Sequence, residues 1–169
     1  MFEGNIRIYG NHARILKKYS KNKQAEEQFE FKVTDNQGNE HSIYIFDTML
    51  QAYMVAAMIG IIHKSKVEKD NGKEPTATIF TEVLGKNRQN LERIVRFMLL
   101  TEGDVNNPDV IIKEAFSIKN KENIDKKVTS YARYGLEIID NYFKECSSYE
   151  DVVNAILDLR ENYSINSEI

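Results

Sequence analysis

Apolar residues recur at helical spacing over much of this chain, and the clearest stretch runs from Thr48 to Ile62. Within it, small residues return every four positions at Ala52, Ala56 and Gly60, so they share one side of a helix and allow another backbone to approach closely. The stretch is shorter than the about 20 apolar residues that a membrane span needs, and Gln51 interrupts it. The pattern therefore predicts the buried central helix of a soluble domain.

Alternating apolar and polar residues precede this helix and predict a β-hairpin over about 29–46. Phe31 and Val33 alternate with polar neighbours, and residues 35–38 have the composition of a turn before the return strand. Asp47 then stands just before the helix. We expect Asp47 to cap it, because a carboxylate can accept hydrogen bonds from the first free backbone amides.

Four more helices are predicted downstream by apolar periodicity and by capping residues. They cover about 87–101, a segment that begins at Asn107 and Pro108, about 124–146, and 149–162. Ser148 and Asp151 have the spacing of a capping box at the start of the last helix. The residues of that helix predicted to face inward are Val152, Val153, Ile156 and Leu157.

A glycine inside the predicted helix 124–146 needs a compensating interaction, because glycine in a helix interior costs about 1 kcal/mol relative to alanine. That glycine is Gly135, and Ala132 lies one turn before it. We predict that these two residues pack closely against the row of Ala52, Ala56 and Gly60. The alternatives are that Gly135 clears space for a ligand and that the same row mediates dimerisation.

Taken together, these elements predict a mainly α fold: a single helical domain with a small N-terminal β-hairpin. The hairpin would cover about 29–46 and the helical bundle about 47–163 of one domain, 1–169. A chain of 169 residues with 41% hydrophobic content can bury a core without disulfides. The single cysteine, Cys146, excludes an internal disulfide, and MFEGNIRIYG lacks the pattern of a secretory signal. We therefore expect a cytoplasmic protein.

Charge is distributed unevenly along the chain, although the net charge is only −3. Residues 136–169 have a net charge of −6, and the rest of the chain has a net charge of +3. Basic side chains gather in the predicted helix 87–101 and just before it, at Lys86, Arg88, Arg93 and Arg96. If these residues formed one face, they would favour salt-dependent, sequence-nonspecific DNA binding. The alternative is an ordinary solvated helix face.

No catalytic, metal or cofactor motif is present in the sequence. His12, His41 and His63 are scattered, and neither HExxH nor CxxC spacing occurs. Gly85 and Lys86 lack the upstream glycine and the following Ser or Thr of a phosphate-binding loop. We therefore expect a protein that is not an enzyme and that has no cofactor and no metal.

Several segments together resemble the small accessory proteins of bacterial DNA-phosphorothioation (Dnd-type) defence loci. They are the hairpin, FDTMLQAYMVAAMIGIIHKSK, a helix ending RFMLLTEG, and SYARYGLEIIDNYF, within about 29–145. The resemblance rests on helix-packing residues such as Tyr131, Ala132, Gly135 and Leu136. The chain departs from the family at Tyr134, where a second small residue is usual. The resemblance implies a prokaryotic genome-defence or mobile-element setting and no catalytic residues.

Tyrosines near the acidic C-terminal region are candidates for anchoring a protein contact, because tyrosine combines apolar area with a polar end. They are Tyr142, Tyr149 and Tyr163. The sequence thus favours a non-enzymatic accessory or adaptor protein that binds a protein partner and no membrane. The alternatives are a DNA-binding subunit and a phage-encoded inhibitor of a host defence enzyme.

Overall fold

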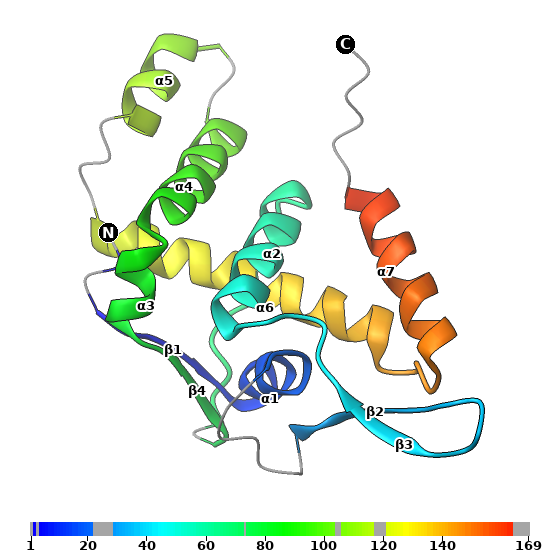
Figure 1. Cartoon of the computed structure of the whole chain (residues 1–169). Helices are drawn as coiled ribbons and strands as arrows, with labels where there is room; N and C mark the ends of the chain where they lie inside the picture. The colour runs from blue at the N-terminus through cyan, green and yellow to red at the C-terminus, as the bar shows by residue number, and fades with distance from the viewer. Residues whose placement is uncertain are drawn as a thin grey trace.

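Two long helices, α2 (Met49–Ile62) and α6 (Lys121–Phe143), cross at the centre of the computed structural model (Figure 1). The structure describes residues 2, 4–21, 29–72, 74–103, 106–116 and 121–163, without the side chains of 121–123. α2 contains no charged residue, so it can lie in the interior without leaving a charge unpaired.

The remaining elements surround this pair of helices. In chain order they are β1 (Ile6–Tyr9), α1 (Gly10–Tyr19), β2 (Phe31–Thr34), β3 (Glu40–Ile43), β4 (Thr76–Ile79), α3 (Thr81–Lys86), α4 (Arg88–Glu102), α5 (Pro108–Phe116) and α7 (Tyr149–Tyr163). The predicted mainly α fold is confirmed. The predicted hairpin is confirmed as well, since β2 and β3 pair antiparallel with Phe31 opposite Ile43.

A second antiparallel sheet joins the beginning of the chain to its middle. β1 pairs with β4, placing Ile6 opposite Ile79 and Tyr9 opposite Thr76. The two strands lie far apart in the sequence, so no hairpin turn between them signals their pairing. The pairing brings the start of α3 next to the N-terminal segment, where the amide and hydroxyl of Thr81 both donate to the side-chain oxygen of Asn5.

The start of α2 differs from the prediction, because Asp47 does not cap it. The cap is Thr48, whose backbone is extended and whose hydroxyl oxygen accepts a hydrogen bond from the amide of Gln51 at 3.1 Å. The helix begins at Met49, so the residue directly before it occupies the N-cap position. Asp47 is exposed and lies one position before the N-cap.

The start of α7 agrees with the prediction. The amide of Asp151 donates to the hydroxyl oxygen of Ser148 at 3.1 Å, and the carboxylate of Asp151 accepts from the amide of Ser148 at 2.9 Å. This reciprocal pair is the capping box expected from the spacing of the two residues.

An aromatic cluster in the core connects α1, the hairpin and the end of α6. The ring of Tyr19 lies 5.2 Å from that of Phe31 and 5.7 Å from that of Phe143, centroid to centroid. The Tyr19 hydroxyl donates to the carboxylate of Asp140 at 2.7 Å, which satisfies the polar end of a buried side chain. These contacts hold the hairpin against the helices.

Candidate functional site

The small residues of α2 and α6 lie at a close crossing of the two helices. A Cβ atom at Gly135 would lie 1.9 Å from the carbonyl oxygen of Ala56, and a Cβ at Gly60 would lie 2.2 Å from that of Tyr131. The other small residues of the row, Ala52 and Ala132, are buried too. α6 of the same chain therefore occupies this side of α2, and the row is not a free surface for a second copy.

The four basic residues named above do not form one uniform positive face. Lys86 ends α3, whereas the three arginines lie on α4. Glu92 pairs with two of them: with Arg88 at 2.9 Å and with Arg96 at 3.6 Å. Arg93 is exposed beside these pairs. Glu92 thus offsets part of the positive charge that a phosphate backbone would need.

The prediction that Val153, Ile156 and Leu157 face inward is wrong. Their side chains are 54%, 43% and 46% exposed, and the side of α7 that packs inward carries Val152 and Ala155 instead. Residues 152 and 153 lie about 100° apart around a helix, and in this fold the side of Val152 is covered while that of Val153 is not. α7 therefore presents a second apolar side to solvent.

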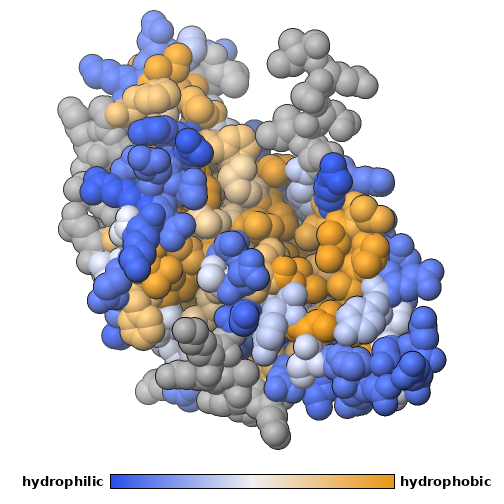
Figure 2. Space-filling model, in the orientation of Figure 1, coloured by the Kyte–Doolittle hydropathy of each residue, from blue (hydrophilic) through white to orange (hydrophobic). Residues whose placement is uncertain are grey.

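Beside this exposed side lies an apolar groove of about 460 Å³, bounded by three helices. Its floor is the side of α2 that carries Val55, Met58 and Ile62, one wall is α4 at Ile94, and the other wall is α7. Figure 2 shows apolar side chains gathered over α2 and along α7. Among the described residues that line the groove, Arg160 is the one with a charge. We call this feature the α2–α4–α7 groove.

Sequence reasoning missed the floor of this groove because it treated all of α2 as buried. α2 is apolar around its whole circumference, and α6 covers only the side with the small residues. A helix that is apolar all round needs neighbours on every side, and here one side has none among the described residues. The apolar residues around the whole circumference of α2 were the sequence signal that more than one neighbour is needed to cover it.

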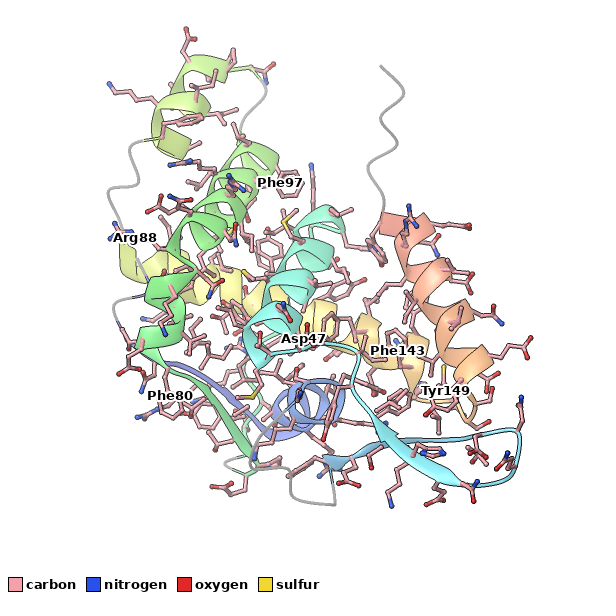
Figure 3. The ribbon with its side chains drawn as sticks, in the orientation of Figure 1. Asp47, Phe80, Arg88, Phe97, Phe143 and Tyr149 are labelled. Atoms are coloured by element: carbon pink, nitrogen blue, oxygen red, sulfur yellow. The ribbon has the colours of Figure 1, made fainter. Side chains whose placement is uncertain are left out.

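Two tyrosines mark the ends of α7, as the view of the side chains shows for Tyr149 at its start (Figure 3). Tyr149 is exposed, whereas Tyr163 lines the groove and its hydroxyl lies 2.7 Å from Nε2 of His63. Burial raises the pKa of Tyr163, helped by the nearby Tyr142 and Tyr134. The hydroxyl therefore stays protonated at neutral pH, and its hydrogen bond to His63 links a groove-lining residue to the C-terminal end of α2.

The residues with catalytic potential are dispersed over the fold. The histidines pair with different groups: His12 with Glu137 at 2.9 Å, His41 with Asp35 at 2.8 Å and His63 with Tyr163 at 2.7 Å. Burial raises the pKa of Cys146, and the carboxylate of Asp151 adds to this effect, so the thiol is protonated at neutral pH. In the described part of the chain, no group of three or more His, Cys, Asp or Glu residues could hold a metal ion.

Comparison with protein-family models, with curated proteins and with solved structures gives no match. The resemblance to Dnd-type accessory proteins therefore stays a prediction. None of the helices described is both long and apolar enough to cross a membrane.

Proposed function

We propose that this protein is a non-enzymatic accessory or adaptor protein that binds a helix of a protein partner in the α2–α4–α7 groove. One observation carries the proposal: an open, apolar groove runs beside a 14-residue helix that has no charged side chain. Contiguous apolar surface of this kind is typical of interaction sites.

The form of the groove favours a helical occupant. Val55, Met58 and Ile62 follow one another along α2 at three- and four-residue intervals, so they form a lengthwise apolar strip. A partner helix lying along such a strip inserts its own residues at the same intervals. Met58 and the neighbouring Met54 are flexible and polarizable, which suits a surface that adapts to its partner.

The charge that lines the groove indicates the chemistry of the partner helix. Arg160 on the α7 wall is the one charged side chain among the described lining residues. An arginine there favours carboxylates on the adjacent flank of an amphipathic helix. The proposed partner segment is therefore an apolar-faced helix with an acidic flank.

The setting that we propose is prokaryotic genome defence or a mobile element, and it rests on the resemblance described above. A phage-encoded inhibitor would use the same groove against a host protein. DNA binding through Lys86, Arg88, Arg93 and Arg96 has less support, because Glu92 pairs with two of these arginines.

A peptide-binding experiment tests the proposal. The probe is a fluorescent helical peptide with leucines at three- and four-residue spacing and glutamates along one flank, and its affinity is measured by anisotropy. We expect Val55→Glu to weaken binding at least tenfold, because it places a carboxylate in an apolar groove opposite an acidic helix.

Val83→Glu is the matched control, since Val83 on α3 is 38% exposed and Val55 is 37% exposed. This control should bind the peptide like the unaltered protein. Absence of peptide binding, or equal loss in both variants, would contradict the proposal. A salt-sensitive gel shift on duplex DNA that disappears in Arg93→Ala/Arg96→Ala would favour the DNA-binding alternative instead.

A further inference from the structure

α7 itself has the chemistry that the groove requires of its occupant. Its exposed side carries an apolar stripe made of Tyr149, Val153, Ile156 and Leu157. The helix has four carboxylates, at Glu150, Asp151, Asp158 and Glu161, against the single Arg160. On a helical wheel, Glu150 and Glu161 lie next to the apolar stripe on the flank beyond Leu157.

We infer that α7 of a second copy of this chain occupies the α2–α4–α7 groove, so that the protein forms a twofold homodimer. The inference rests on the proposed function of the groove and names an occupant for it. The lengths agree, since α7 has 15 residues and α2 has 14, or about 22 and 21 Å at 1.5 Å per residue.

A twofold arrangement fits because α7 is both a wall of the groove and the proposed occupant. Each α7 would lie on α2 of the other copy and beside the other α7, running antiparallel to it. The same surface is then used by both copies, as twofold symmetry requires. One contact covers both the groove and the exposed stripe, which are continuous at Ile156.

The charges of α7 are complementary in this antiparallel register. If Val153 lies opposite Leu157 of the other copy, the two antiparallel helices cross at Ala155. Glu150 and Arg160 are equally far from Ala155, so each Glu150 then lies opposite Arg160 of the other copy. Within one α7 these two charges are ten residues apart, about 15 Å along the axis, so they cannot pair with each other. The dimer would contain two equivalent Glu150–Arg160 ion pairs.

Sedimentation velocity over a wide range of protein concentration tests this inference. We expect a monomer–dimer equilibrium that Val55→Glu weakens at least tenfold and that Val83→Glu leaves unchanged. Glu150→Arg and Arg160→Glu should each weaken the dimer by about tenfold, because each turns two attractive pairs into repulsive ones. The double variant Glu150→Arg/Arg160→Glu should restore dimerisation, since it exchanges the two charges.

Restoration by the double variant separates this register from simple misfolding, and thermal unfolding of each variant checks the fold. The inference would be overturned by a monomer at every concentration, or by a dimer whose dissociation constant is unchanged by Val55→Glu and by the charge reversals. The glutamate-flanked peptide, added to the Glu150→Arg variant with its intact groove, tests the proposed function separately. Peptide binding to a protein that never dimerises would leave the groove function standing and remove only the second copy as its occupant.

Discussion

Gly135 shows how a single residue sets the distance between two helices. Its missing side chain leaves room for the backbone of Ala56, and Gly60 does the same for the backbone of Tyr131. The cost of a glycine in each helix is thus offset by close packing over the crossing of α2 and α6.

Substitution of Gly135 by alanine should lower the free energy of unfolding by about 1–3 kcal/mol, although alanine is the better helix former. The added methyl group would meet the Ala56 carbonyl at 1.9 Å, so the two helices must move apart. Urea denaturation measures the change. Gly85→Ala is the matched control, because Gly85 is also helical and no atom lies within 4 Å of an added Cβ there. Equal effects at both positions would contradict this account.

α7 is the element that connects local sequence to the proposed function. Its start is determined by neighbours in the chain, since Ser148 and Asp151 cap each other. Its two apolar sides have different environments, because Val152 and Ala155 pack inward while Val153 and Leu157 face solvent. Local hydrogen bonds therefore position a helix whose outer side is free to bind.

The cap of α7 should make stability depend on acidic pH. Hydrogen bonds from the amide of Ser147 and from Ser148 hold the pKa of Asp151 below its usual range. A depressed folded-state pKa means that this stabilisation is present above the unfolded pKa of about 3.9 and is lost as pH falls through the folded-state pKa.

Urea midpoints measured at neutral and acidic pH test this expectation. Asp151→Asn should be less stable than the unaltered protein at neutral pH, and the difference should shrink as the pH falls below about 4. Asp109→Asn is a control in the first turn of α5, where the carboxylate is exposed. A difference for Asp151→Asn that does not change with pH would exclude this role of the carboxylate.

Across the whole molecule, burial is concentrated where α2 crosses α6 and is sparse in α5 and α7. α2 has eight buried residues, whereas α5 has Ala115 alone and α7 has Val152 and Ala155. Local opening costs least where few apolar side chains are buried. The groove thus combines a stable floor with a less stable wall.

Native-state hydrogen exchange should reproduce this order. In dilute protein, we expect amides of α2 and α6 to exchange most slowly and those of α5 and α7 fastest. At high protein concentration, protection should rise in α7 and on the groove side of α2 if the homodimer forms, but not in α5. Uniform protection of all helices in dilute protein would contradict this ranking, and a rise in α5 alone would indicate a different interface.

Much of the fold could be predicted because its signals are local. The spacing of apolar residues placed α2, α4, α6 and α7 within a few residues of their observed ends, and alternation placed the hairpin. Gly135 and the row at Ala52, Ala56 and Gly60 indicated a close helix crossing. In each case the periodicity of one segment, or a cap formed by near neighbours, carries the information.

What only the tertiary structure decided is which side of each helix is covered and which remains open. The periodicity of α7 marks Val152 and Val153 alike as apolar, yet one is buried and the other exposed. The groove exists because α6 covers one side of α2 while α4 and α7 stand apart over the other. The sequence by itself determined where helices form, because that depends on contacts within a few residues, whereas the groove depends on how segments distant in sequence pack together.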